Sequence, residues 1–145
     1  MIHVDAQIGS HTKIWHEHLS NIGKCRIGND CTIHSHVWIA DGVIIGNGVK
    51  IQAFTFIPKG VVIEDGAFIG PRVTFTNDKY PPRTENDWQE IHVGRNSSLG
   101  AGVVVLPGVT IGEEVLIGAG SVVTKNIPSH CVAYGVPAMA TSKLH

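Results

Sequence analysis

Branched aliphatic residues recur every six positions along most of the chain. The first run is Ile27, Ile33, Ile39, Ile45, Ile51, Ile57, Ile63 and Ile69, closed by Phe75, and the step resumes at Val93, Leu99, Val105, Ile111, Ile117 and Val123. Four residues after each aliphatic stands a smaller residue, such as Cys31, Val37, Thr55, Ala67 or Ser97. An α-helix would need apolar spacings of three and four with few glycines, so the pattern predicts short strands.

Turn-forming residues fill the positions between these strands, in the runs IGND, IADG, IGNG and IEDG. One large and one small inward residue in every six describe a strand followed by a tight turn. A unit of this size cannot bury its apolar side alone, so the units must wind into a coil and stack. The alternative is an irregular β-sandwich.

The repeats resemble those of the hexapeptide-repeat acyltransferases, over roughly residues 8–138. The resemblance implies an all-β fold, a left-handed parallel β-helix with three repeats per coil, in a single domain spanning residues 1–145. Residues 18 apart then stack, which predicts three inner rows. The rows are Ile27, Ile45 and Ile63; Ile33, Ile51 and Ile69; and Ile39, Ile57 and Phe75.

Three segments depart from the period. Residues 76–92 hold two prolines, several charges and a tryptophan, which predicts an external loop leaving one corner of the prism. The step from Ile14 to Ile27 is thirteen, so the first coil should bulge or slip by one residue. After Val123 the period is lost, and we expect a short C-terminal extension with room for a short helix.

Composition narrows the choice of partners. Eleven Lys and Arg against twelve Asp and Glu leave a net charge of −1, which gives no reason to expect nucleic acid or an anionic membrane. No run of 18 apolar residues predicts a membrane span, and the N-terminus lacks the pattern of a signal peptide. Three cysteines fit no disulfide framework. We therefore expect a cytoplasmic protein.

The segment from Gly70 to Pro82 reads GPRVTFTNDKYPP. It resembles N-acetyltransferases that modify nucleotide-linked amino sugars, above all 3-amino sugars. That resemblance implies that Asn77 and Asp78 line the sugar site, with Asn77 in the catalytic role, and that Tyr80 and Arg83 lie nearby.

Related O-acetyltransferases carry a catalytic histidine before a proline in this segment. Here that place is Tyr80, and the predicted loop has no histidine before His92. A hydroxyl needs a general base to become a nucleophile, whereas an unprotonated amine does not. The missing histidine therefore favours nitrogen as the acceptor.

Residues one coil before Asn77 are further candidates. By resemblance, Gln52 and Lys59 help to hold the hexose; alternatively, Gln52 ladders along the prism face and Lys59 is a solvated corner. His34 and His36 are alternate residues on one strand and face the same way. His34 is the candidate base at a neighbouring subunit's cleft, because an imidazole can accept a proton near neutral pH.

Small residues predict where an acyl donor lies. Gly100, Ala101, Gly118 and Ala119 form a stripe along one edge, where an extended ligand can approach the backbone. By resemblance this stripe holds the pantetheine arm of acetyl-CoA, with Lys125 near its phosphate; alternatively, tight turns simply require small residues. The chain has nine histidines, and one carbonic anhydrase class uses such a prism to bind zinc. No convergent set of three is evident, so we expect no metal.

The resemblance implies a homotrimer with acetyl-CoA sites between neighbouring prisms. The expected reaction is acetyl transfer to the amine of a dTDP-3-amino-3,6-dideoxyhexose or a related UDP sugar, in cell-surface polysaccharide biosynthesis such as that of lipopolysaccharide. Two alternatives remain open at this point: an O-acetyltransferase acting on a sugar or serine-like hydroxyl with His34 as base, and a non-catalytic scaffold.

Overall fold

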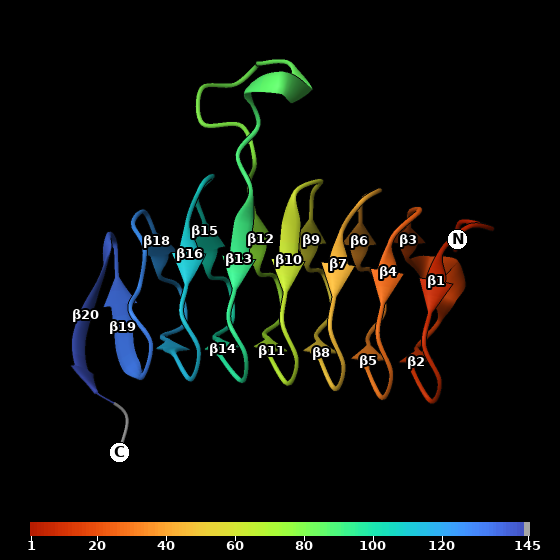
Figure 1. Ribbon diagram of the computed structural model, residues 1–145, viewed down its shortest axis with the longest axis horizontal. Helices are drawn as coiled ribbons and strands as arrows, with labels where there is room; N and C mark the ends of the chain where they lie inside the picture. Colours follow the sequence, from red (N-terminus) through yellow and green to blue (C-terminus); the bar gives the residue numbers. More distant parts are fainter. Residues whose placement is uncertain (144–145) are drawn as a thin grey trace.

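The computed structural model, which describes residues 1–143, is a prism of stacked coils with three flat faces (Figure 1). Each coil contributes one short strand to each face. Face 1 consists of β1 (Gln7–Ile8), β4 (Arg26–Ile27), β7 (Ile44–Ile45), β10 (Val61–Ile63), β13 (Ile91–Val93) and β16 (Thr110–Ile111). Within each face of the prism, strands from successive coils pair in parallel.

Faces 2 and 3 repeat the arrangement. Face 2 consists of β2 (Lys13–Ile14), β5 (Thr32–Ile33), β8 (Lys50–Ile51), β11 (Phe68–Ile69), β14 (Ser98–Leu99), β17 (Leu116–Ile117), β19 (Cys131–Gly135) and β20 (Ala138–Lys143). Face 3 consists of β3 (Asn21–Ile22), β6 (Trp38–Ile39), β9 (Phe56–Ile57), β12 (Thr74–Phe75), β15 (Val104–Val105) and β18 (Val122–Val123). The fold is the left-handed parallel β-helix that the resemblance to hexapeptide-repeat acyltransferases implies.

The predicted inner rows are confirmed by the strand register. Ile27 pairs with Ile45 and Ile45 with Ile63 on face 1, and the other two rows follow their own faces in the same way. These aliphatics are almost fully buried. The small inner row is buried too, and its hydroxyls donate to backbone carbonyls: Ser97 Oγ lies 2.7 Å from Gly112 O. Such bonds satisfy polar groups that the thin core would otherwise leave without partners.

The turns explain why Asn and Asp crowd the corners. At the corner between faces 1 and 2, the Asn29 amide donates to Asn47 Oδ1 and the Asn47 amide to Asp65 Oδ1, both at 2.8 Å. Each side chain thus caps the backbone of the preceding coil. The corner between faces 2 and 3 and the corner between faces 3 and 1 are called the 2/3 corner and the 3/1 corner below.

The irregular first coil is confirmed. A 3₁₀ turn, η1 (Glu17–Leu19), lengthens the step from Ile14 to Ile22, and a shortened corner then leads to Ile27. Ile8 pairs with Ile27 at an offset of 19, whereas Ile22 pairs with Ile39 at 17. The next coil restores the regular stacking.

Two boundaries differ from the predictions. The external loop covers residues 76–90, because Ile91 already pairs with Val61 and His92 with Val62 on face 1; His92 therefore belongs to the prism. Up to residue 143, the C-terminal extension holds no helix: β19 and β20 form an antiparallel hairpin that covers the end of face 2. Antiparallel pairing gives β19 the hydrogen bonds that a further coil would have supplied. No helix in the described residues is long and apolar enough to cross a membrane.

Candidate acceptor pocket and the edges of face 3

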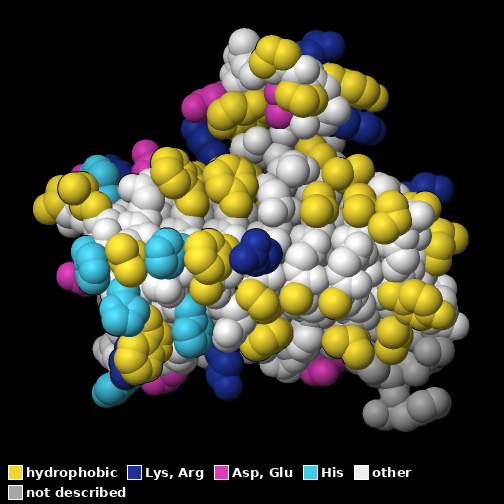
Figure 2. Space-filling model, turned by 180° about the vertical axis from the view of Figure 1, so that it is seen from behind, with side chains coloured by type: hydrophobic (Ala, Val, Ile, Leu, Met, Phe, Trp, Pro, Cys, Tyr) yellow, Lys and Arg dark blue, Asp and Glu magenta, His cyan; other side chains and the backbone are white. Residues whose placement is uncertain are grey.

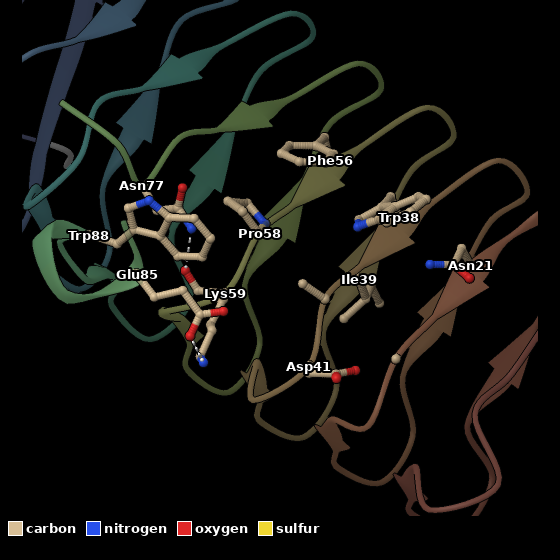
Figure 3. A pocket seen from close by; sticks show the side chains of 12 residues that line it. Asn21, Trp38, Ile39, Asp41, Phe56, Pro58, Lys59, Asn77, Glu85 and Trp88 are labelled. Carbon is tan, nitrogen blue, oxygen red and sulfur yellow. Dashed lines mark hydrogen bonds and ion pairs between the residues drawn. The ribbon is translucent and has the colours of Figure 1, made fainter. Parts of the chain in front are cut away.

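The external loop leaves the prism at the 3/1 corner and projects outward from it (Figure 1). Between loop and prism lies an open pocket of about 560 Å³. Its lining residues are Asn21, Gly23, Trp38, Ile39, Ala40, Asp41, Phe56, Pro58, Lys59, Asn77, Glu85 and Trp88 (Figure 3). This volume lies within the range of small-molecule sites.

Asn77 sits where the chain leaves the prism and ties the loop to it. Its side-chain Nδ2 donates to Lys59 O at 2.9 Å, and its carbonyl accepts the Gln89 amide at 2.9 Å. The carbonyl bond closes the base of the loop, because Gln89 lies on the returning strand of chain. The Asn77 side-chain oxygen accepts no hydrogen bond from the described residues, so it is available to a ligand.

Lys59 connects the prism to the loop through an ion pair. Its ammonium lies 2.7 Å from Glu85 Oε2, in the 3₁₀ turn η2 (Glu85–Asp87). Both side chains are more than half exposed, so the ion pair fixes geometry more than it adds stability. The sequence predicted Lys59 and Asn77 one coil apart at a shared corner, and the structure brings both into this pocket.

Aromatic side chains line the pocket, and the sequence analysis did not single them out. Trp38 and Phe56 point outward from adjacent strands of face 3, with ring centroids 6.4 Å apart, and Trp88 comes from the loop (Figure 3). The Trp88 indole nitrogen is buried and has no hydrogen-bond partner among the described residues. One signal in the sequence could have revealed the prism side of this pocket. In two successive coils, an aromatic residue stands directly before the inner aliphatic residue.

The other predicted loop residues lie outside this pocket. Asp78 folds the loop itself: its carboxylate accepts the Tyr80 amide at 3.1 Å and the Arg83 amide at 2.6 Å. Asp78, Tyr80 and Arg83 line a smaller hollow of about 170 Å³ together with Lys79, Asp87 and Gln89. The structure therefore places them apart from Asn77 and Lys59.

His34 and Gln52 lie at the 2/3 corner, on the opposite edge of face 3 from Asn77. Their amides donate to Ile51 O and Ile69 O in successive coils, so the two residues lie one coil apart at the same place on this corner. The His34 ring stacks on Trp15 with centroids 6.5 Å apart. Histidines gather on the N-terminal side of the molecule (Figure 2). Within one chain, His34 is not brought to the pocket at Asn77.

The small-residue stripe runs along the same 2/3 corner, over the C-terminal coils. The amides of Gly100 and Gly118 donate to Ile117 O and Ala133 O, so they are not available to a ligand. The Ala101 and Ala119 amides, by contrast, donate to no carbonyl within the described residues. Lys125 lies elsewhere: like Asn77, it stands two residues past the inner residue of a face 3 strand, at the 3/1 corner.

The cysteines are buried in the core. Desolvation raises the pKa of the Cys25 thiol to about 11 and also raises the pKa of Cys31 and Cys131. Thiols held protonated are weak nucleophiles. In residues 1–143, no three His, Cys, Asp or Glu side chains are grouped so that they could hold a metal ion.

Comparison of the sequence with known families matches most of the repeats to hexapeptide-repeat transferases. A family described as "Bacterial transferase hexapeptide (six repeats)" matches residues 42–77 and 90–125, and "Hexapeptide repeat of succinyl-transferase" matches residues 24–57. The galactoside O-acetyltransferase of Lactococcus lactis is 41% identical over 85 residues, which is 54% of this chain and 41% of that protein. The Escherichia coli enzyme of the same name is 43% identical over 79 residues, covering 50% of this chain and 39% of its own length. The matches thus span less than half of these relatives.

Structural comparison finds the same architecture. AntD, an N-acyltransferase from Bacillus cereus solved as a point mutant with dTDP-4-amino-4,6-dideoxyglucose and coenzyme A, superposes with a TM-score of 0.84 at 23% identity. The match covers 96% of this chain and 84% of AntD. Perosamine N-acetyltransferase from Caulobacter crescentus, also solved as a point mutant, with CoA and GDP-perosamine, gives 0.69 at 22% identity, covering 95% and 58%. At such identities the likeness is one of fold.

Proposed function

Because this chain belongs to the hexapeptide-repeat transferases, we propose that it transfers an acetyl group from acetyl-CoA to the amine of a nucleotide-linked amino sugar. The observation that carries the proposal is the pocket at Asn77. It has polar side chains and aromatic walls, but no histidine among its lining residues. A site with no histidine to activate a hydroxyl suits an amine, which needs no such activation.

The proposed reaction forms one bond and breaks one. The amine nitrogen attacks the thioester carbonyl, the C–N bond forms, the C–S bond breaks, and the departing thiolate takes up the proton that the nitrogen loses. The products are the N-acetyl sugar and free coenzyme A. Asn77 orients the acceptor, and most of the rate enhancement comes from holding both reactants together.

The arrangement of the two edges supports a homotrimer. The pocket and the small-residue stripe lie on opposite edges of face 3, so a neighbouring copy must bring a stripe to each pocket. The outward residues of face 3 include no charged side chain: they are Asn21, Trp38, Phe56, Thr74, Val104 and Val122. An uncharged face suits contact between copies, and cyclic symmetry closes such contacts.

Acetyl transfer to a hydroxyl is the second candidate. The sequence relatives named above are galactoside O-acetyltransferases, which favours it. The base would then be His34 of a neighbouring copy, reaching the pocket across the same contact that brings the stripe. Transfer to a hydroxyl predicts that His34→Ala loses activity. Transfer to an amine predicts that His34→Ala retains most of its turnover.

Thiol release from acetyl-CoA with a panel of dTDP- and UDP-linked amino sugars tests the reaction class. We expect release with one amine and none with its hydroxyl analogue. Release only with hydroxyl acceptors would establish the second candidate. If calorimetry detects no binding of coenzyme A, the hypothesis of a non-catalytic scaffold is favoured. The sugar of the panel that the protein acetylates would identify the nucleotide carrier, dTDP or UDP. It would also test the proposed role in cell-surface polysaccharide synthesis.

Asn77→Ala tests the pocket directly. Because the side chain both anchors the loop to Lys59 O and faces the acceptor, turnover should fall more than about tenfold. The oligomeric state, measured by light scattering, should be unchanged. Asn126→Ala serves as an amide control away from the pocket, since Asn126 Oδ1 accepts the Thr110 amide. Wild-type turnover in Asn77→Ala would refute the role.

A further inference from the structure

The acceptor pocket is acidic for a site proposed to receive a phosphorylated sugar. Its lining includes Asp41, Glu85 and a single cation, Lys59. Lys59 is already paired with Glu85, so Asp41 leaves the pocket with a net negative charge. A diphosphate would be disfavoured here, whereas a cationic group would be attracted.

Both carboxylates retain an unused oxygen. Asp41 Oδ1 accepts the Lys24 amide at 2.7 Å, which fixes the side chain at its corner, and Glu85 Oε2 accepts from Lys59. Asp41 Oδ2 and Glu85 Oε1 accept no hydrogen bond from the described residues. Two such oxygens on one pocket can each take a hydrogen bond from an ammonium group, and charge-assisted bonds are the stronger kind.

The aromatic walls complete a cation-binding environment. Trp38, whose side chain is about half exposed, lines the prism side of the pocket, and Trp88 lines the side formed by the loop. Indole faces attract ammonium groups. The Trp88 N–H itself is buried and closed to a ligand in the open pocket, so the indole contributes its ring rather than a hydrogen bond.

We propose that Asp41 and Glu85 select the acceptor in its ammonium form, between Trp38 and Trp88, and so discriminate amino sugars from their hydroxyl analogues. This inference rests on the proposed function and names the group that the same pocket recognises. Binding itself transfers no proton; the ammonium loses one to solvent before the nitrogen attacks. Low pH therefore favours binding, and higher pH favours turnover.

Calorimetry with coenzyme A in place of acetyl-CoA tests this without turnover. The probes are dTDP-3-amino-3,6-dideoxyglucose and dTDP-6-deoxyglucose, which differ in one amino group. The wild type should bind the amino sugar about tenfold more tightly, as expected for a charge-assisted hydrogen bond. The preference should disappear when the pH is raised above the pKa of the sugar's own amine.

The double variant Asp41→Asn, Glu85→Gln should lose the preference while keeping its affinity for coenzyme A. Glu90→Gln, in the same loop but outside the pocket lining, is the matched control and should keep the preference. A preference that survives in the double variant, or equal binding of both probes to the wild type, would overturn the inference. Failure of the proposed function looks different: the preference is present, yet no thiol is released from acetyl-CoA.

Discussion

The 2/3 corner is built in two ways along its length. In three N-terminal coils its left-handed position holds His36, Phe54 and Arg72, with φ of 59°, 63° and 59°. In two C-terminal coils the same position holds Gly102 and Gly120, with φ of 70° and 73°. The backbone is alike in both halves, so the difference lies in the side chains.

The N-terminal half of the corner carries a stacked ladder. His36 and Phe54 lie with ring centroids 4.8 Å apart, and the Arg72 guanidinium lies 5.3 Å from the Phe54 ring. A bulky residue in the left-handed region is strained, and stacking offsets that cost. Over the C-terminal half, a Cβ added to Gly102 or Gly120 would meet nothing within 4 Å. Only this half offers an extended ligand an open backbone.

The largest predicted effect comes from closing the open half. Ala101→Trp places a large ring over the stripe, and affinity for coenzyme A should fall at least about a hundredfold, or about 2.7 kcal/mol. Ala101 is exposed, so the fold should survive. Ala53→Trp, at the equivalent place in the N-terminal half, should bind coenzyme A normally. Equal losses in both variants, measured by calorimetry, would erase the distinction between the halves.

Two glycines of the open half should differ in stability. A Cβ on Gly100 would lie 2.7 Å from Ala119 N in the next coil, so Gly100→Ala should destabilise the fold by about 2–3 kcal/mol. Gly102→Ala meets only the positive φ and should cost about 1 kcal/mol. Denaturant unfolding measures both. The reverse order would mean that close approach of the coils does not limit this edge.

Phe54 tests the balance between strain and stacking in the N-terminal half. Phe54→Ala loses the stack and keeps the strain, so it should cost about 1.5 kcal/mol. Phe54→Gly also removes the strain and should be less destabilising by about 0.5–1 kcal/mol. If the alanine variant is the more stable of the two, the left-handed backbone imposes no cost here.

The smallest effect concerns the thiols, which lie at both ends. Because burial raises the pKa of Cys25 to about 11, native protein at pH 8 should label slowly with thiol reagents. Cys131, in the hairpin that ends the prism, should react before Cys25, since terminal elements open more readily. Mass spectrometry of partly labelled protein gives the order.

The raised pKa of Cys25 also predicts how the stability of the fold changes at alkaline pH. The folded state holds the Cys25 proton more tightly, so its contribution to stability is complete below pH 9 and declines as pH rises towards 11. Cys25→Ala should lack this part of the decline. Identical alkaline profiles for variant and wild type would show that the Cys25 thiol makes no such contribution.

Much of the candidate site was predictable one residue at a time, but its assembly was not. Lys59 and Asn77 share a column because each stands two residues past an inner residue of face 3, and this could be counted from the sequence. Asp78 directly follows Asn77, yet local hydrogen bonds to the Tyr80 and Arg83 amides turn it away from the pocket. Whether a carboxylate caps its own loop or faces a ligand depends on geometry that spacing does not record.

The six-residue period by itself determined the strands, the position of the loop and the irregular register of the first coil. The inner rows needed in addition the three repeats per coil that the family resemblance implied. Each of these follows from burial within the stack, because every repeat must bury its inner residue against the neighbouring coils. Only the tertiary structure decided that Trp88 and Glu85 of the loop line one pocket with Trp38 and Lys59 of the prism, and that pocket and stripe occupy opposite edges of face 3. The loop has no period, so its docking depends on long-range side-chain contacts.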